Sequence, residues 1–383
     1  MEIVELTTYR VQPRWVFLKV TTDEGIVGWG EPNLEGKTDA VLGALDEIEE
    51  YLVGEDPRKV EHHWQSLYRG GFYHRGGALN SALAGVDQAL WDIKGKALGK
   101  PVYELLGGPT RESIRVYGPV VGDESPERLD APGDVLAERA RERVEAGYDA
   151  VKIIPFGEMW PVEKPNAVST VADRVRQVRA AVGDDVDIAI DAHGKLSPAM
   201  ARRVVEAVEP YDPLFVEEPV RPEYDHRLSE LRQQTSVPIA TGERRYSRWD
   251  FREVIDSGID VVQPDASHAG GISETRRIAS LAETYGVSVA PHCPLGPVAL
   301  ASCVAVDAAI PNFLIQELPG FYGGDHNRYT TTGLSVENGA LQLPDRPGLG
   351  VELDEDELRD PANQGHDQYI PTRYHEDGSV ADW

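Results

Sequence analysis

The chain has 383 residues, of which 41% are hydrophobic, so it is long enough for two or three globular domains and too apolar for wholesale disorder. No apolar run approaches the ~18 residues of a membrane-spanning helix, and we expect no signal peptide because the first residues lack a basic segment. With 65 acidic against 38 basic residues the net charge is −27, which argues against nucleic acid and anionic membranes as partners.

The cysteine content and the excess of acidic residues also predict the cellular location of the protein and the salt concentration in which it works. Two cysteines, Cys293 and Cys303, are too few for a disulfide framework, which favours a reducing, cytoplasmic location. The acidic residues predict a solvated, carboxylate-rich surface. We hypothesise adaptation to high salt, where ions screen the self-repulsion of such a surface.

The first part of the chain, residues 1–111, is predicted to form an α+β domain. Short runs of alternating polarity indicate a three-stranded antiparallel meander, followed by amphipathic helical patterns. The predicted strands are residues 4–12, 16–22 and 25–30, and the predicted helices are residues 40–52, 60–68 and 78–97.

Residues 112–340 show a different rhythm, in which short β-branched or apolar runs alternate with helical patterns. The runs are residues 114–117, 150–154, 186–190, 214–216, 238–241, 259–263, 287–290 and 313–316, and helical stretches include 135–145, 168–182, 199–208 and 274–285. Eight strands that alternate with helices favour a closed parallel α/β barrel over an open sheet. The remaining segment, residues 341–383, is polar apart from residues 348–353, and we expect it to dock back on the first domain.

Ionisable residues follow nearly every predicted barrel strand, at the end where barrel enzymes carry their working groups. Asp191, Glu217 and Glu243 are each separated by 26 residues, about one strand–helix unit. Three successive strands therefore aim three carboxylates at one point, and such a group needs a cation to offset its repulsion. Oxygen ligands without cysteine or histidine favour Mg²⁺.

Two histidines are predicted to face the same site. Asp265 and His292 end neighbouring strands, and a carboxylate bonded to one imidazole nitrogen raises the basicity of the other, which makes a general base. His193 lies two residues past Asp191, on the same face, where it could protonate a leaving group. Glu317 ends the last strand, where it would donate a hydrogen bond to a developing oxyanion if protonated, or otherwise share in positioning.

The chain resembles the mandelate racemase subgroup of the enolase superfamily over nearly its whole length. The resemblance rests on the order of the candidate site residues described above. It also rests on residues 13–15, 29–32, 69–73, 86–96, 215–219, 267–272, 290–297 and 374–383. It implies a capping domain followed by a modified TIM barrel, (β/α)7β, and, because members of the subgroup form oligomers, a homo-oligomer.

Within that subgroup the chain is most similar to the dehydratases of sugar acids. The resemblance implies one Mg²⁺ per subunit on Asp191, Glu217 and Glu243, and removal of the α-proton by His292, which Asp265 supports. It implies that His193 protonates the departing 3-hydroxyl and that Glu317 stabilises the enediolate. A small-molecule aldonate would become a 2-keto-3-deoxy acid, with D-galactonate as the expected substrate.

Departures from the family pattern leave alternatives open. The racemases carry a Lys-x-Lys pair on the second barrel strand, whereas this chain has Lys152 followed by Ile154, which argues for elimination rather than 1,1-proton transfer. Arg245 and a longer loop over residues 122–134 are unusual for galactonate enzymes. Gluconate, xylonate or arabinonate therefore remain open as substrates, as do an epimerase or racemase and a relative that binds metal without catalysis.

Loops of the capping domain are expected to supply the contacts to the far end of the substrate. Residues 31–36 and 68–77 are the candidates, because Phe72, Tyr73, His74 and Arg75 suit stacking on a polyol and hydrogen bonding to it. The glycines around them would let the second loop close as a lid.

Overall fold

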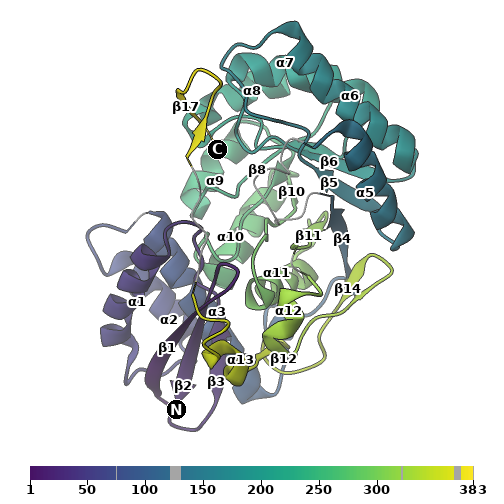
Figure 1. The fold of residues 1–383 in the computed structure, drawn as a ribbon. Helices are drawn as coiled ribbons and strands as arrows, with labels where there is room; N and C mark the ends of the chain where they lie inside the picture. Colours follow the sequence, from purple (N-terminus) through teal and green to yellow (C-terminus); the bar gives the residue numbers. More distant parts are fainter. Residues whose placement is uncertain (75, 121–130, 321, 366–371, 383) are drawn as a thin grey trace.

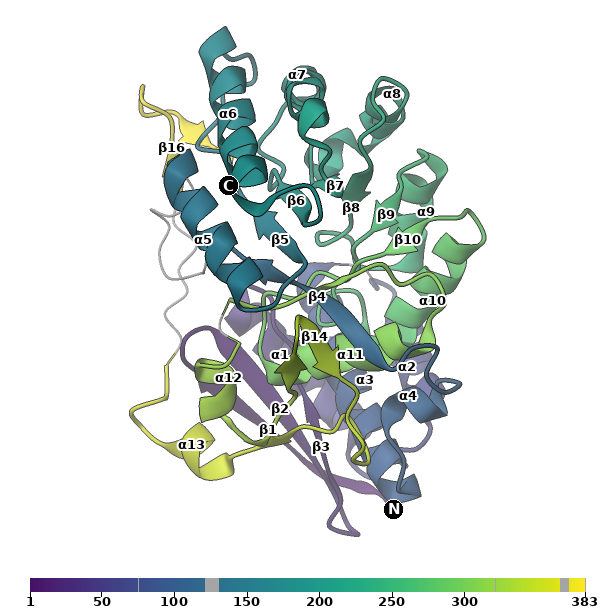
Figure 2. The same ribbon diagram turned by 90° about the vertical axis from the view of Figure 1, so that its right-hand side faces the viewer.

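The computed structural model describes residues 1–74, 76–120, 131–320, 322–365 and 372–382, and every structural statement concerns these ranges. The N-terminal sheet and its helices form one part of the molecule, and the barrel forms the other (Figure 1). Elements from the C-terminal part of the chain run back beside the N-terminal sheet, as a second view also shows (Figure 2).

The N-terminal part is a three-stranded antiparallel sheet covered by helices, which confirms the predicted meander. The strands lie in the order β1-β2-β3, with Leu18 opposite both Thr8 and Gly30. The elements are β1 (Ile3–Val11), β2 (Trp15–Thr22), β3 (Val27–Gly30), α1 (Thr38–Leu52), α2 (Val60–Arg69), α3 (Gly77–Leu98) and α4 (Val102–Leu105).

Helix α3 packs on β3 with almost no space between the two backbones. A Cβ at Gly30 would lie 2.0 Å from the carbonyl oxygen of Gly85, and one at Gly28 would lie 2.2 Å from that of Ala89. Only glycine permits this approach. The contact holds α3 directly against the N-terminal sheet.

Eight parallel strands form the barrel. They pair in chain order from β4 to β10, and β11 returns to pair with β4 through Gln316 and Val116, while Val289 bridges to Phe313. The strands are β4 (Ser113–Pro119), β5 (Ala150–Ile153), β6 (Asp187–Asp191), β7 (Phe215–Glu217), β8 (Ile239–Thr241), β9 (Val261–Val262), β10 (Ser288–Val289) and β11 (Gln316–Glu317). The predicted parallel barrel is therefore confirmed.

The barrel helices cover the outside of these strands (Figure 2). They are α5 (Gly133–Glu145), α6 (Pro165–Val182), α7 (Pro198–Val208), α8 (Leu228–Arg232), α9 (Arg248–Asp256), α10 (Gly271–Glu283) and α11 (Pro297–Ala309), with short 3₁₀ turns at Glu209–Tyr211 and Pro222–Arg227. Helix α11 is buried on nearly all sides, because it lies between the barrel and the N-terminal part. Its sequence therefore lacks the amphipathic period of a surface helix.

The last part of the chain returns to the N-terminal sheet and helices. Leu349 N donates to Asp92 Oδ1 at 2.8 Å, and Val102 N donates to Gly348 O at 2.9 Å. Gln12 N also donates to Asn363 O at 3.0 Å, beside the edge of β1. The elements are α12 (Asp325–Arg328), β12 (Thr330–Thr332), β13 (Val336–Glu337), β14 (Ala340–Gln342), β15 (Glu352–Leu353), α13 (Glu355–Arg359), β16 (Arg373–Tyr374) and β17 (Val380–Ala381).

A buried group of polar side chains connects the N-terminal part to the barrel, and we call Glu31, Asp87 and Gln88 the polar joint. Glu31 accepts hydrogen bonds from Gly296 N at 2.6 Å and Ala299 N at 2.9 Å, at the start of α11. Asp87 accepts from the backbone and hydroxyl of Ser273, and Gln88 donates to Ala266 O and the Ser267 hydroxyl. Each buried polar group is thus satisfied across the contact between the two parts.

Among the helices in the described part of the chain, none has both the length and the apolar character that a bilayer crossing requires.

Candidate active site

The predicted site residues gather at the carboxyl ends of the barrel strands. Asp191 and Glu217 are the last residues of neighbouring strands and stand opposite each other in the parallel register of β6 and β7. His193 follows β6, Glu317 ends β11, and Glu243, Asp265 and His292 lie two or three residues past the ends of β8, β9 and β10. Lys152 lies on β5. The parallel strands all present these ends to the same opening, so the sequence positions and the geometry agree.

Lys152 lies among three of the carboxylates. Its ammonium nitrogen is 2.7 Å from Glu317 Oε1, 3.2 Å from Glu217 Oε1 and 3.3 Å from Asp191 Oδ2. The side chain is 9% exposed and those of Asp191 and Glu217 are 1% and 0% exposed. One positive group therefore offsets three negative groups in a place from which water is nearly excluded.

The pKa values of Glu217 and Lys152 reflect this excess of negative over positive charge. Burial raises the pKa of Glu217, and the negative charge of Asp191 raises it further. Burial alone lowers the pKa of Lys152, but the carboxylates of Glu217 and Glu317 raise it well above its usual value. Ionised carboxylates at this point thus need more positive charge than Lys152 supplies.

Glu243 lies toward the histidine side of the site. Its Oε2 is 3.5 Å from His292 Nε2, and its Oε1 is 3.9 Å from Arg244 Nε. Glu243 Oε2 and Asp191 Oδ2 are both buried and accept no hydrogen bond from the described residues, although each lies near a positive group. Buried carboxylate oxygens with unused acceptor capacity fit a hard divalent cation such as Mg²⁺.

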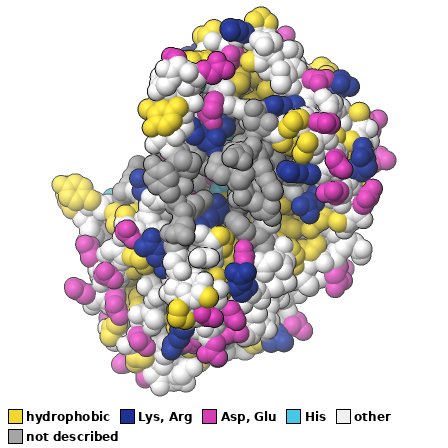
Figure 3. Space-filling model, in the orientation of Figure 1, with side chains coloured by type: hydrophobic (Ala, Val, Ile, Leu, Met, Phe, Trp, Pro, Cys, Tyr) yellow, Lys and Arg dark blue, Asp and Glu magenta, His cyan; other side chains and the backbone are white. Residues whose placement is uncertain are grey.

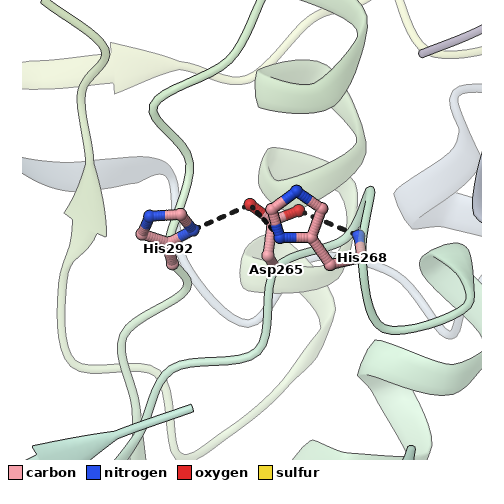
Figure 4. Close-up of side chains that lie close together, drawn as sticks. All are labelled: Asp265, His268 and His292. Carbon is pink, nitrogen blue, oxygen red and sulfur yellow. Dashed lines mark hydrogen bonds and ion pairs between the residues drawn. The ribbon is translucent and has the colours of Figure 1, made fainter. Parts of the chain in front are cut away.

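His292 and Asp265 form the predicted pair. Asp265 Oδ2 is 2.8 Å from His292 Nδ1 (Figure 4). Asp265 Oδ1 accepts hydrogen bonds from the backbone of Ser267 and His268. Burial on its own lowers the pKa of His292, but Glu243 and Asp265 raise it well above its usual value. The pair therefore fixes the ring so that Nε2 faces Glu243.

His268 is a third member of this cluster that the sequence reasoning did not assign. Its Nδ1 is 3.7 Å from Asp265 Oδ2 and its Nε2 is 3.4 Å from Glu35 Oε2, on a loop of the N-terminal part. Within the described ranges, potential metal-ligand atoms gather within 4.8 Å of one another at Asp265, His268 and His292 (Figure 4). The carboxylates of Asp191, Glu217 and Glu243 contact basic side chains in this structure. These are Lys152 at Asp191 and Glu217, His193 at Asp191, and His292 at Glu243.

His193 contacts the Asp191 carboxylate through both backbone and ring. Its backbone nitrogen donates to Asp191 Oδ1 at 2.9 Å, and its Nε2 is 3.2 Å from Asp191 Oδ2. The residue has φ 51°, a left-handed conformation that costs a non-glycine residue free energy. Burial lowers the pKa of the imidazole, but Asp191 raises it overall, which favours the protonated ring.

Glu317 completes the group on the opposite side. Its Oε2 accepts a hydrogen bond from Cys293 N at 2.7 Å, and its Oε1 contacts Lys152. Burial raises the pKa of this carboxyl, but Lys152 and His292 lower it below its usual value. The structure thus favours the ionised form of Glu317, which can accept hydrogen bonds and balance positive charge.

Glu218 and Arg245 belong to a group of contacts that was not predicted from the sequence. Glu218 is fully buried and accepts hydrogen bonds from the Thr241 hydroxyl, Arg244 and Arg245. Arg245 also pairs with Asp225, so its guanidinium supports the loops behind the site. The adjacent glutamates have different partners, Lys152 for Glu217 and the two arginines for Glu218. Glu218 lies just past β7 with φ 42°, so no strand period predicts its direction.

The loop that follows α2 holds its aromatic rings away from the protein. Phe72 and Tyr73 are 90% and 85% exposed and contact each other edge to face. The expected contacts to a polyol are therefore not preformed here, while Tyr68 stacks between Trp64 and Trp249. Arg75 and most of the longer loop over residues 122–134 lie outside the described residues.

Charged side chains of both signs are spread over the face seen in Figure 3, where acidic groups are numerous. The predicted carboxylate-rich surface is consistent with this distribution.

Two family descriptions match the chain. Residues 4–107 match the N-terminal domain of mandelate racemase and muconate lactonizing enzyme, and residues 135–357 match the enolase C-terminal domain-like family. Among curated proteins, a D-galactonate dehydratase of Ralstonia nicotianae is 46% identical over 391 residues, with 100% of both chains covered. A D-galactonate dehydratase of Pectobacterium atrosepticum is 44% identical over 390 residues, again with full coverage of both.

Solved structures agree with these matches. An enolase from Agrobacterium radiobacter with bound sodium and L-malate is 35% identical, with a TM-score of 0.90 and 100% of each chain covered. A member of the enolase superfamily from Salmonella Typhimurium is 31% identical, with a TM-score of 0.89, and the match covers 94% of this chain and 98% of that one.

Proposed function

The chain belongs to the mandelate racemase and muconate lactonizing enzyme group of the enolase superfamily, and we propose that it is a Mg²⁺-dependent dehydratase that converts D-galactonate to a 2-keto-3-deoxy acid. The full-length identity of 44–46% to D-galactonate dehydratases is the observation that carries the proposal. The buried carboxylates and the His292–Asp265 pair supply the chemical groups that such a reaction needs.

We propose Asp191, Glu217 and Glu243 as the residues that hold Mg²⁺. The buried oxygens Asp191 Oδ2 and Glu243 Oε2, which accept no hydrogen bond from the described residues, support this, as does the raised pKa of Glu217, whose causes are burial and the charge of Asp191. When bound, the ion would supply positive charge to the substrate carboxylate and make the α-proton more acidic.

We propose His292 as the base that takes the α-proton from C2. Asp265 holds Nδ1, so Nε2 is the nitrogen that receives the proton. Glu243 raises the pKa of His292, and a cation held by Glu243 would offset that charge and so favour the neutral ring that a base requires. The electron pair left at C2 forms a double bond to C3 as the 3-hydroxyl leaves. The resulting enol then converts to the 2-keto-3-deoxy acid, and the atoms balance as loss of one water.

We propose His193 as the acid that protonates the departing hydroxyl. Asp191 favours its protonated ring, so it can donate a proton and leave as neutral imidazole. Glu317 would help to position the reacting end through Lys152, whose ammonium it contacts at 2.7 Å. Position 154, directly after strand β5, is isoleucine where the racemases have a second lysine. This strand therefore supplies no such base, which favours elimination over racemisation.

We also propose a role for each of three segments of the chain. Residues 1–111 would cap the site, residues 112–340 would form the catalytic barrel, and residues 341–383 would return to the cap. The contacts of Leu349 with Asp92 and of Gln12 with Asn363 support this last assignment.

We further propose a homo-oligomer that works in a salt-rich cytoplasm. The two buried thiols and the net charge of −27 support the environment. If the salt proposal holds, the midpoint of thermal unfolding rises between dilute and molar KCl, whereas an unchanged or falling midpoint contradicts it. Sedimentation of the purified protein tests the oligomer.

A screen of aldonates tests the proposed function. The purified protein with MgCl₂ and KCl is offered C5 and C6 aldonates, and 2-keto-3-deoxy acids are detected colorimetrically. We expect the highest kcat/KM with D-galactonate. A preference for gluconate, xylonate or arabinonate would change the substrate and keep the reaction class. Exchange of the α-proton in D₂O without keto product would instead indicate an epimerase or racemase.

A further inference from the structure

Lys195 lies in the turn that follows β6, two residues after His193, and has no role in the mechanism above. The backbone of this turn is fixed, because Lys195 N donates to Ala192 O at 3.0 Å and Gly194 N donates to Glu218 O at 2.7 Å. His193 and Gly194 both have left-handed φ values, 51° and 67°, which turn the chain sharply at the opening of the barrel. The starting point of the Lys195 side chain is therefore defined by the ends of two barrel strands.

The ammonium of Lys195 is buried and makes no hydrogen bond. The side chain is 1% exposed, and its Nζ has no hydrogen-bond partner among the described residues. Its ion-pair partner, Glu158 Oε1, lies 3.7 Å away, beyond hydrogen-bond distance. A buried ammonium has three donors to satisfy, so this arrangement is unfavourable unless another acceptor is present.

Glu158 is already engaged by a second cation. Its Oε1 accepts a hydrogen bond from Arg373 Nη1 at 2.8 Å, on strand β16 of the C-terminal hairpin. The ring of His375 in that hairpin stacks on Trp160 with 3.8 Å between centroids. These contacts hold Glu158 toward the hairpin, so two positive groups share one carboxylate.

The position of Lys195 relates it to the proposed chemistry. Burial lowers the pKa of its ammonium, Glu158 raises it, and Asp191 acts on it in the same direction as Glu158. Lys195 follows Asp191, the last residue of β6, by four positions, in a turn whose backbone is fixed at the carboxyl ends of β6 and β7. Its turn also carries His193, the proposed acid at the 3-hydroxyl.

We propose that Lys195 binds the substrate, donating hydrogen bonds to hydroxyl oxygens of the aldonate beyond C3, and so helps to set its specificity. The proposal rests on the proposed function, because that function places the carboxylate end of the substrate at Asp191, Glu217 and Glu243. An ammonium with three donors suits the hydroxyl groups of the remaining chain.

The test compares Lys195→Met with Lys195→Arg in the full-length enzyme with Mg²⁺. For Lys195→Met we expect KM for D-galactonate to rise about tenfold or more, since a charged donor is lost, with a smaller change in kcat. Lys195→Arg should recover part of the loss, because it keeps a positive donor. Lys164→Met, an exposed lysine of the neighbouring loop, is the matched control and should change neither value.

Three results separate the explanations. An unchanged KM in Lys195→Met, with a lower unfolding temperature, would mean that the lysine is structural and would overturn the inference. A loss confined to a diacid such as galactarate would also overturn it, because the partner would then be a distal carboxylate. If the wild-type enzyme dehydrates no sugar acid, the proposed function itself fails, whatever the variants do.

Discussion

Glu31 in the polar joint and Glu217 in the active site are both fully buried carboxylates, but they are held by different kinds of partner. Two backbone N–H groups at the start of α11 donate to Glu31. Glu217 instead lies beside the charged groups of Lys152 and Asp191. Neutral backbone donors fix Glu31 in one arrangement. The energy and protonation of Glu217 depend on the charges around it, so they change when a cation or anion binds nearby.

The polar joint holds the N-terminal part and the barrel together, whereas the active-site carboxylates serve the proposed reaction. In the joint, removal of a carboxylate leaves donors without acceptors, so stability falls. In the site, removal of a carboxylate relieves repulsion, so function falls while stability is kept. Changes of single residues can test this contrast.

The largest effect is expected for Glu217→Gln. The neutral amide removes one charge from the proposed metal site, and metal ions supply several kcal/mol of charge stabilisation. We expect turnover to fall on the order of a thousandfold or more, with weaker Mg²⁺ binding by calorimetry. The unfolding temperature without Mg²⁺ should not fall. Glu206→Gln, on the exposed side of α7, is the control, and wild-type turnover in Glu217→Gln would refute the metal assignment.

His292→Asn should remove the base and keep the fold. General bases contribute about 10²–10⁴-fold, so kcat should fall by that factor. Exchange of the substrate α-proton in D₂O, followed by NMR, should disappear as well. Exchange at the wild-type rate would show that another residue takes the proton.

Lys152→Met should make stability depend on the metal. Removing one partner of a buried ion pair costs about 3–5 kcal/mol, because Asp191, Glu217 and Glu317 lose their shared positive group. Denaturant titration with and without Mg²⁺ measures this, and we expect the added ion to recover part of the loss. An equal loss in both conditions would show that no cation takes over the role of the ammonium. Lys100→Met, at an exposed position, is the control.

Glu31→Gln should have the smallest effect and should act on stability. The amide NH₂ cannot accept from one of the two backbone donors, which costs about 1–3 kcal/mol. The kcat of the folded enzyme should stay close to the wild-type value. A loss of kcat without a loss of stability would mean that the joint belongs to the reaction, and Glu5→Gln serves as an exposed control.

The pH dependence of the same variant sharpens the contrast. Burial raises the pKa of Glu31 to about 8, so the folded state keeps a proton that the unfolded chain has lost at neutral pH. The contribution of this group to stability is therefore full at low pH and decreases as pH rises toward 8. The stability difference between wild type and Glu31→Gln should shrink between pH 5 and 8. A constant difference would contradict the raised pKa.

Much of the barrel and the site could be predicted because both depend on local patterns. The strand runs end at the residues that carry charge, so Asp191, Glu217 and the Asp265–His292 pair could be placed without coordinates. Helix α11 gave no amphipathic signal, because both of its faces are buried. The period of a helix becomes visible in a sequence only where one face meets water.

The residues that were missed depend on contacts between distant segments. His268 meets Glu35 across 233 positions of sequence, and Lys195 meets Glu158, which the C-terminal hairpin also holds. No periodicity connects such positions. The buried Lys152 was placed on its strand correctly, but its contacts with three carboxylates follow from the closure of the barrel.

The return of residues 349–364 to the N-terminal part also has a consequence for synthesis. Strand β1 and helix α3 leave the ribosome first, yet Gln12 N and the Asp92 carboxylate find their partners in Asn363 and Leu349. At about 5–20 residues per second, the delay before those partners emerge is on the order of tens of seconds. During that interval Gln12 N and the Asp92 carboxylate of the nascent N-terminal part lack these partners, so the N-terminal part completes its contacts only after the whole barrel has been synthesised.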